Sequence, residues 1–262
     1  MDMQILFIGD VVGKSGCRYL ERTLPELRRQ YGADVTIVNG ENSAPGNGIT
    51  AASAQQIFQC GADLITTGNH AFQRRDSLAI FERRDVLRPA NYPEGCPGHG
   101  VEILDLGRCR VAVLNLMGTV FLEALDNPFA AADALLAEID TPNIFVDFHA
   151  EATSEKKCMG YYLAGRVTAV CGTHTHVQTA DEEILEGHTG YITDAGMTGP
   201  ARSVLGVDVQ RATDKQRLHC PVQFIEATGE AMLNGVSITF DPSTGKCTKI
   251  ERIFMRESTN VR

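Results

Sequence analysis

The chain has 262 residues, with 24 lysines and arginines against 33 aspartates and glutamates, so its formal net charge is −9. A hydrophobic fraction of 43% and a charged fraction of 22% exclude a disordered chain. The acidic balance argues against a surface for extended nucleic acid, which needs dense lysine and arginine. No run approaches the roughly 18 consecutive apolar residues of a membrane-spanning helix, so no membrane partner is expected.

Eight cysteines are scattered through the chain without a C-x-x-C pair. Such cysteines are commonly small buried hydrophobes, which favours a reducing compartment. The first residues, Met1–Gln4, carry no basic charge, and the apolar run after them is too short for a signal peptide. We therefore expect a cytoplasmic protein. The length, with no repeat or clear linker, predicts one domain over residues 1–262.

Strands and helices alternate from the start of the chain. Short apolar runs predict buried strands at Gln4–Gly9, Asp34–Val38 and Asp63–Thr67. Between them, helices are predicted at Cys17–Tyr31, where leucines recur at helical spacing, and at Thr50–Cys60. This alternation is typical of a mostly parallel sheet.

The middle of the chain continues the alternation after a predicted hairpin. In order, the predicted elements are hairpin strands at Val101–Leu106 and Cys109–Leu116, a helix from Asn127 to Glu138, a strand at Asn143–Phe148, a helix at Thr153–Leu163 and a strand at Thr168–Cys171. Thr153 is expected to be the N-cap of its helix.

Strands dominate the predicted C-terminal third. They are expected at Ile184–Leu185, Tyr191–Thr193, Pro221–Ile225, Ala231–Phe240 and Lys246–Phe254, with a turn at Asp241–Gly245. Two packed sheets flanked by helices accommodate both halves of the chain, so an α/β fold is predicted.

Metal-binding side chains follow five of the predicted strands. They are Asp10; Glu41 and Asn42; Asn69 and His70; His149; and His174 and His176. In open α/β sheets, ligands collect beyond the carboxyl ends of the strands. Each residue alone has a structural explanation, as a helix cap, a turn residue or a hydrogen-bonded core histidine. Together, and with two imidazoles two residues apart, they predict a metal site.

The donor types restrict the metal. Carboxylates, amides and imidazoles without a thiolate suit manganese, iron or zinc rather than an iron–sulfur cluster or a structural zinc site. Six or seven donors are too many for one tetrahedral ion. They fit two ions about 3.5–4 Å apart, bridged by a carboxylate and a hydroxide. Such a pair polarises a phosphoryl oxygen and activates the bridging water, so the pattern indicates hydrolysis.

Six longer strings contain or flank these residues. They are GDVVGKSG at 9–16, NGENSAPGNGIT at 39–50, TTGNHAFQ at 66–73, VDFHAEATSEK at 146–156, GTHTHVQTAD at 172–181 and YITDAGMTGP at 191–200. Their GD, GNH, lone histidine and H-x-H elements resemble the calcineurin-like metallophosphoesterases. The resemblance is closer to the YmdB-like branch of that superfamily and covers about residues 4–210.

The resemblance implies a four-layer α/β/β/α sandwich and phosphodiesterase activity on cyclic nucleotides, with 2′,3′-cyclic nucleotides favoured. It also implies two divalent ions per chain, with iron or manganese expected before zinc. By motif match, one ion would take Asp10, Glu41, Asn42 and His176, and the other Glu41, Asn69, His149 and His174. Glu41 would then bridge the two. A homo-oligomer is expected from the same resemblance and from the apolar C-terminal strands.

The chain departs from the broad superfamily at two points. The bridging residue there is usually aspartate, and the first motif is Asp-x-His, whereas position 12 here is Val12. Asn42 is expected to supply a metal ligand in place of that missing histidine. His70 directly follows the expected ligand Asn69, so we assign it as the general acid that protonates the departing ribose oxygen while the hydroxide attacks phosphorus.

Four other residues keep two interpretations each. Glu151 either hydrogen-bonds a ligand imidazole or is a solvated residue at a helix start. Asp194 has either a functional role or an ordinary turn role. Arg74 and Arg75 either contact phosphate or carry charge on a helix surface.

Two other functions compete with the phosphodiesterase. Amidohydrolases also use paired histidines, but they place H-x-H on the first strand and normally add a metal-bridging lysine, and no lysine ends a strand here. The second alternative is a non-catalytic regulatory protein that binds a metal or a cyclic nucleotide. The full donor set and His70 favour the enzyme.

Overall fold

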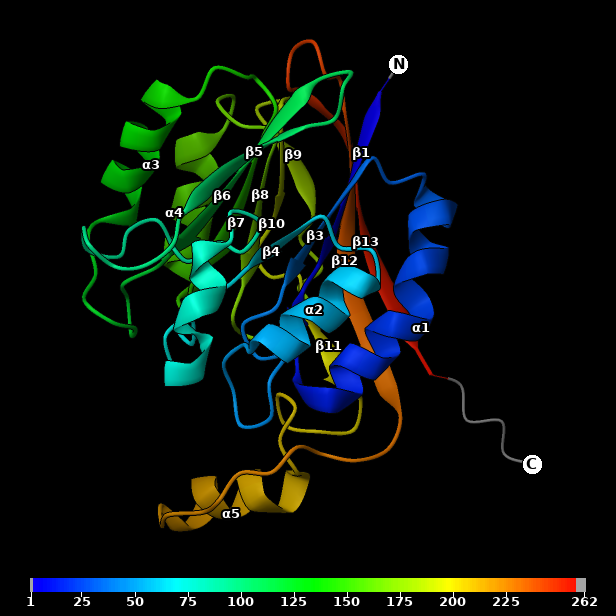
Figure 1. The fold of residues 1–262 in the computed structure, drawn as a ribbon, viewed down its shortest axis with the longest axis vertical. Coiled ribbons are helices and arrows are strands. Elements are labelled where there is room, and N and C mark those ends of the chain that lie inside the picture. Colours follow the sequence, from blue (N-terminus) through cyan, green and yellow to red (C-terminus); the bar gives the residue numbers. More distant parts are fainter. Residues whose placement is uncertain (1, 258–262) are drawn as a thin grey trace.

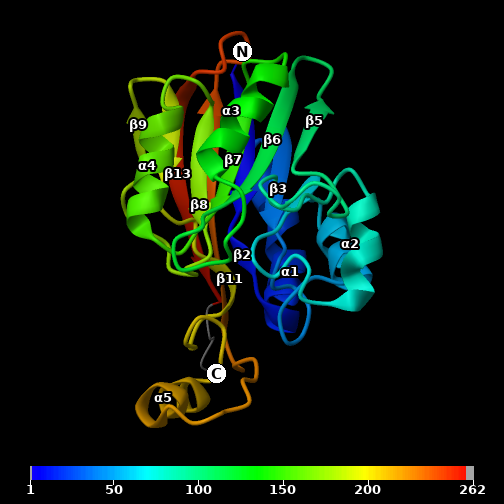
Figure 2. The same ribbon diagram turned by 90° about the vertical axis from the view of Figure 1, so that its left-hand side faces the viewer.

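The computed structural model describes residues 2–257. Two β-sheets pack face to face, and helices cover the outer face of each (Figures 1 and 2). The layers therefore run α/β/β/α, as the sequence analysis predicted.

The first sheet has seven strands and contains the N-terminal strand. Its order is β2-β11-β12-β1-β3-β4, and β13 pairs with β12. The bounds are Met3–Ile8 (β1), Asp10–Val11 (β2), Val35–Asn39 (β3), Leu64–Thr66 (β4), Met197–Pro200 (β11), Ala231–Phe240 (β12) and Cys247–Arg256 (β13). Strands β1, β3 and β4 are parallel, so their carboxyl ends meet at one edge.

The second sheet has six strands in the order β5-β6-β7-β8-β10-β9. The bounds are Val101–Asp105 (β5), Arg110–Met117 (β6), Ile144–His149 (β7), Ala169–Thr173 (β8), Glu183–Leu185 (β9) and Thr189–Ile192 (β10). Strands β6, β7, β8 and β10 are parallel, while β5 and β9 join the two edges in antiparallel fashion.

Helices complete the two outer layers, except for the last helix, which lies apart from both sheets (Figures 1 and 2). The bounds are Gly13–Tyr31 (α1), Ala51–Gln59 (α2), Pro128–Glu138 (α3), Thr153–Leu163 (α4) and Val209–Leu218 (α5), with a 3₁₀ helix at Arg75–Glu82 (η1). Helix α1 packs on β11 and β12, whereas α3 packs on β6 and α4 on β8.

Three apolar layers lie between these four layers of structure. On β1, Leu6 and Ile8 point into the cluster that contains the leucines of α1. Ile5 and Phe7 point the other way, into the layer between the sheets, where Phe7 lies 4.9 Å from Phe145 between ring centroids. Because both faces of the strand are buried, its sequence is a continuous apolar run rather than an alternating one.

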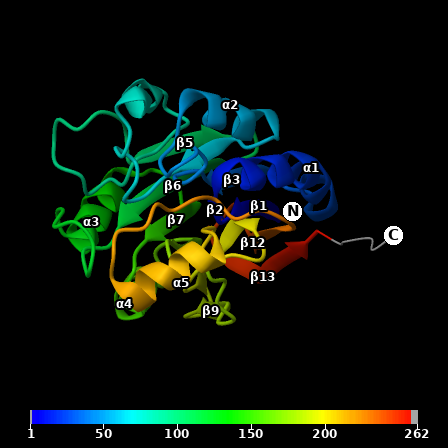
Figure 3. The same cartoon turned by 90° about the horizontal axis from the view of Figure 1, so that it is seen from below.

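The C-terminal third, where strands were predicted to dominate, differs from the prediction at two places. Pro221–Ile225 does not form a strand, and α5 was not predicted. Both lie in residues 201–230, here called the arm, which leaves the first sheet after β11 and returns to it at β12. The arm projects beyond the carboxyl ends of β1 and β3 (Figures 1 and 3). Only Ala212 of α5 is buried, so the helix has no apolar stripe for a sequence pattern to detect.

Other differences concern element boundaries. Helix α1 begins at Gly13, four residues before the predicted start. Thr50 caps α2 as a capping box with Ser53. The N-cap of α4 is Ala152 without a side-chain hydrogen bond, so the expectation for Thr153 was wrong. The 3₁₀ helix η1 was not predicted.

Candidate metal centre

The predicted ligands come from the strand ends of both sheets. Asp10 lies just beyond β1, Glu41 and Asn42 follow β3, and Asn69 and His70 follow β4. His149 is the last residue of β7, while His174 and His176 follow β8. The sequence analysis placed these side chains at a common edge. The structure forms that edge from two sheets whose carboxyl ends meet.

Glu41 lies in the middle of this group. Its Oε2 is 3.3 Å from Nε2 of His149, and its Oε1 is 3.3 Å from Nδ1 of His70. Glu41, His149 and His174 each offer one atom within 4.8 Å of the others, a separation suited to a shared cation. Burial raises the pKa of Glu41, but the adjacent His149 and His70 outweigh it and lower the pKa to about 2.

His149 is held by a chain of buried hydrogen bonds. Its Nδ1 lies 2.9 Å from Oγ1 of Thr173, which in turn donates to Oδ1 of Asp147 at 2.7 Å. Since that hydroxyl gives its proton to the carboxylate, it accepts the proton of Nδ1. The lone pair of Nε2 therefore faces Asn69, whose Oδ1 is 2.9 Å away. Outer hydrogen bonds of this kind orient a metal-ligating imidazole.

The other two imidazoles are oriented in the same way. In His174, Nε2 lies 2.9 Å from a carboxylate oxygen of Glu151, and Nδ1 faces Nε2 of His149 at 3.0 Å. In His176, Nδ1 donates to the carbonyl of Leu205 at 3.0 Å, and Nε2 lies 3.8 Å from Oδ1 of Asp10. Each ring thus has one nitrogen engaged outside the centre and one facing into it.

Two buried oxygens at the centre have no hydrogen-bond partner among residues 2–257. They are Oδ1 of Asp10 and Oδ1 of Asn42. Burial, followed by the charge of Glu41, raises the pKa of Asp10 well above its ordinary value. Unpaired buried oxygens are costly unless something compensates them. Cations held between the seven predicted donors would do so, and the donor types fit manganese, iron or zinc.

His70 lies beside this group with a quarter of its side chain exposed. Its backbone N–H and its Nδ1 both approach Glu41, at 3.3 Å. Burial lowers the pKa of His70, but the hydrogen bond and charge of Glu41 outweigh it and raise the pKa. His70 therefore faces the centre while keeping access to solvent, as a proton donor to a bound substrate must.

A buried ion pair supports the loop that carries His174 and His176. Both histidines have positive φ, 105° and 64°, which is strained for residues other than glycine. Asp194 accepts hydrogen bonds from the backbone N–H and hydroxyl of Thr175, at 3.0 and 2.7 Å, and from Nζ of Lys156 at 2.6 Å. Asp194 thus positions the loop that carries His174 and His176. The sequence analysis did not identify its partner Lys156.

A glycine before one ligand motif allows the two sheets to approach closely. A Cβ on Gly68, which precedes Asn69, would lie 2.2 Å from Cδ2 of His149. Only glycine fits there, so the GNH string keeps the β4 loop against the imidazole from β7.

Of the remaining candidates, one contacts a proposed ligand and two do not. Glu151 contacts His174, as one of its two interpretations proposed. Arg74 pairs with Asp76 and donates to the carbonyl of Pro45 at 3.3 Å, while Arg75 is exposed.

Within residues 2–257, no helix is long and apolar enough to cross a bilayer.

Comparison with known proteins shows the family of the chain. The model of the YmdB-like protein family matches residues 6–253. The chain belongs to this family. The chain is also 48% identical to a 2′,3′-cyclic-nucleotide 2′-phosphodiesterase of Bacillus subtilis, over 97% of this chain and 98% of the relative.

Two solved structures show the YmdB-like fold in other bacteria. A structure described as a novel phosphatase from Mycoplasma pneumoniae has a TM-score of 0.94 and 34% identity, and covers 99% of this chain and 95% of its own. A hypothetical protein from Thermus thermophilus has a TM-score of 0.93 and 39% identity, covering 98% and 100%. These similarities confirm the predicted fold class and the expectation of a phosphodiesterase. The amidohydrolase alternative is therefore not retained.

Proposed function

We propose that the chain is a metal-dependent phosphodiesterase that hydrolyses 2′,3′-cyclic nucleotides at the centre described above. The observation that carries this proposal is the set of inward-facing imidazole lone pairs beside the unpartnered oxygens of Asp10 and Asn42. The relative from Bacillus subtilis supports the choice of the 2′,3′ ring.

Two divalent ions are assigned to two overlapping donor sets. One set is Asp10, Glu41, Asn42 and His176, and the other is Glu41, Asn69, His149 and His174. Iron and manganese suit these mixed oxygen and imidazole donors, with zinc as the third choice. When bound, the ions supply the charge that polarises the phosphoryl group and lowers the pKa of the attacking water.

His70 has the role of general acid. A hydroxide, left when the attacking water loses a proton to solvent, adds to phosphorus, the bond from phosphorus to the ribose oxygen breaks, and its electron pair stays on that oxygen. The protonated imidazole of His70 donates to the oxygen as the bond breaks. Glu41 favours the protonated form of His70 through the contact at 3.3 Å.

Three broader expectations remain part of the proposal. We keep residues 1–262 as one metallophosphoesterase domain. We also keep a cytoplasmic location, which suits the eight free cysteines. A homo-oligomer is kept as well, since the edge strand β13 exposes Phe254.

The test is hydrolysis of 2′,3′-cyclic AMP beside 3′,5′-cyclic AMP and bis(p-nitrophenyl) phosphate, with Mn²⁺ or Fe²⁺ and with a chelator. We expect turnover that favours the 2′,3′ ring and is lost with the chelator. Turnover of the generic diester alone would overturn the substrate. Binding of a cyclic nucleotide by the metal-loaded protein without hydrolysis would instead favour the regulatory alternative.

A further inference from the structure

A pocket of about 280 Å³ opens directly from the metal centre, between the loop at residues 44–48 and the arm. Its lining includes Asn42 and His176, two of the proposed ligands. The pocket therefore adjoins the place where a phosphate would bind. The volume is close to the lower end of the range for small-molecule sites, about 300 Å³, so it suits one small group rather than a polymer.

The walls of the pocket are apolar and partly exposed. Pro45 lies on the loop side, and Leu205, Phe224 and Ile225 lie on the arm side. The Phe224 side chain is 54% exposed although it lines a pocket. No lysine or arginine is found among the described residues that line it. Such walls do not suit a phosphate, but they suit a flat, weakly polar group that covers the exposed rings.

The one carboxylate in the lining is already engaged. Glu226 accepts hydrogen bonds from the backbone N–H groups of Ser15 and Lys14, at 2.7 and 3.1 Å, and from the Ser15 hydroxyl at 2.5 Å. These groups form the N-terminus of α1, where a negative charge is stabilised. Glu226 thus fixes the neighbouring Phe224 and Ile225 to the body of the protein and adds no free charge to the pocket.

Both walls are held by hydrogen bonds within the protein, and the arm wall is tied directly to His176. On the arm, the carbonyl of Leu205 holds Nδ1 of His176, and the N–H of Asp208 donates to the carbonyl of Ile225 at 3.0 Å. On the loop, Arg74 donates to the carbonyl of Pro45 at 3.3 Å. The pocket is therefore preformed, which reduces the entropy lost on binding.

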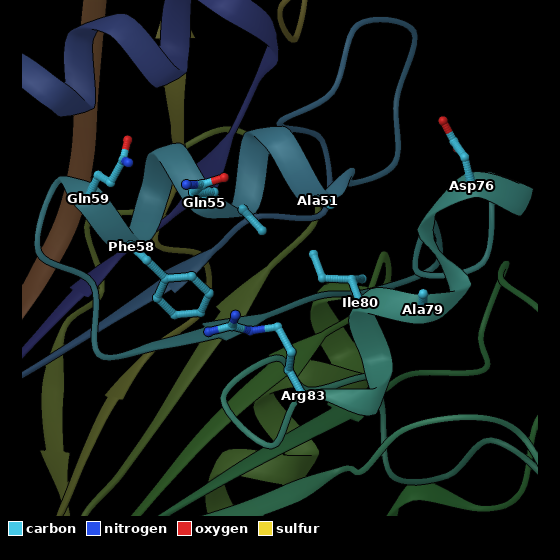
Figure 4. Close-up of a pocket in the computed structure, with 9 residues that line it drawn as sticks. Ala51, Gln55, Phe58, Gln59, Asp76, Ala79, Ile80 and Arg83 are labelled. Atoms are coloured by element: carbon cyan, nitrogen blue, oxygen red, sulfur yellow. The ribbon is translucent and has the colours of Figure 1, made fainter.

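Two other places with a phenylalanine side chain are weaker candidates for binding such a flat, weakly polar group. Phe121, on the loop after β6, is 86% exposed, but it does not line the pocket beside the metal centre. A larger cavity of about 700 Å³ lies between α2 and η1, where Phe58, Ile80 and Arg83 meet (Figure 4). None of the proposed metal ligands lines that cavity, and Arg83 already lies over the Phe58 ring at 4.8 Å.

We infer that the pocket between residues 44–48 and the arm binds the nucleoside base of the cyclic nucleotide, with Phe224 as the surface on which the base stacks. The inference rests on the proposed function and adds a base-binding subsite to it. Base stacking on an aromatic ring tolerates any base, because every base has a π-face.

The test compares 2′,3′-cyclic AMP with the 2′,3′-cyclic phosphate of methyl riboside, which has the same ring and phosphate but no base. For 2′,3′-cyclic AMP, Phe224→Ala is expected to raise KM by about 5- to 150-fold with little change in kcat. For the base-free substrate, KM should not change. Phe224→Trp, which keeps a stacking surface, should keep the wild-type KM.

Two controls make the result decisive. Phe254→Ala removes a similarly exposed phenylalanine, 62% exposed on β13 and outside the pocket lining, and should leave both KM values unchanged. Phe121→Ala should also have no effect. An equal KM change for both substrates in Phe224→Ala, or a base-dependent change in Phe121→Ala instead, would overturn the inference. Failure of wild-type protein to hydrolyse either substrate would contradict the proposed function itself.

Discussion

The metal centre and the arm are neighbours at the carboxyl ends of the strands, yet they are built in opposite ways. The centre consists of buried side chains such as Asp10 and His149, fixed by two sheets and by buried hydrogen bonds. The arm exposes apolar side chains, including Leu218 and Phe224, and joins the body through a few polar contacts such as that of Glu226. The proposed chemistry thus lies on the part fixed by the two sheets, and the proposed base binding lies on the projecting part.

This difference predicts that substitutions in the two regions change different quantities. Changes at the centre should affect metal content and kcat. Changes in its supporting ion pairs should affect stability, and changes in the arm should affect KM for substrates that carry a base. The predictions below run from the largest expected effect to the smallest.

The largest effect is expected from Glu41→Ala. Glu41 belongs to both proposed donor sets and lies 3.3 Å from His149, so its removal should lower the metal content and reduce turnover below detection. Metal analysis and the cyclic-nucleotide assay measure both. The exposed Glu94 provides a matched Glu→Ala control. Full metal content and normal turnover in Glu41→Ala would contradict its bridging position.

His70→Ala is expected to separate catalysis from metal binding. Loss of a general acid typically lowers the rate by about 10²- to 10⁴-fold, while both ions should stay bound. His99→Ala, at an exposed histidine, is the control. If His70→Ala also loses metal, His70 is a ligand rather than an acid.

Lys156→Met tests the ion pair beneath the His174 loop. The substitution leaves Asp194 charged and unpaired in a buried site, which should cost about 3–5 kcal/mol in the free energy of unfolding. Lys157→Met removes the partly exposed pairs with Asp181 and Glu183 and the contact of Nζ with the Tyr191 ring at 4.7 Å, and should cost about 1 kcal/mol. Urea unfolding of the metal-free proteins measures both, and equal costs would contradict the positioning role.

The smallest effect is expected from Asp181→Asn. Burial raises the pKa of Asp181, but hydrogen bonds from Lys157 and Thr193 outweigh it and lower the pKa below its ordinary value of 3.8. A lowered folded-state pKa stabilises the protein above the unfolded-state pKa, and this contribution is lost as the pH falls through the folded-state value. Wild type should therefore be more stable than Asp181→Asn at pH 7, and the difference should shrink below about pH 4. A constant difference in urea unfolding between pH 7 and pH 3 would exclude this cause.

The sequence predicted which strand ends come together at the candidate centre, because the signals there are local. Each ligand follows a short apolar strand, and glycines such as Gly68 precede the motifs where backbones must approach closely. Apart from the short strands β2 and β11, which were not predicted, the buried strands were predicted to within a few residues, since both of their faces are covered.

The parts that escaped prediction depend on contacts between distant residues. Lys156 lies in a charged helical stretch that reads as a solvated face, and only its pairing with Asp194 shows why it is buried. Pro221–Ile225 has the composition of a strand, but it leaves the sheet with the arm and finds no strand partner. Glu226 acts through its hydrogen bonds to the N-terminus of α1, and Leu205 acts through its hydrogen bond to His176. No local sequence pattern reveals either contact.

The most direct test of the account is the number of metal ions per chain, measured on protein that has been stripped with a chelator and then dialysed against Mn²⁺ or Fe²⁺. The account predicts two ions per folded chain, and loss of metal in His176→Ala as well as in His149→Ala, because each histidine belongs to a different donor set. A single ion per wild-type chain, or no loss in either variant, would contradict the dinuclear centre.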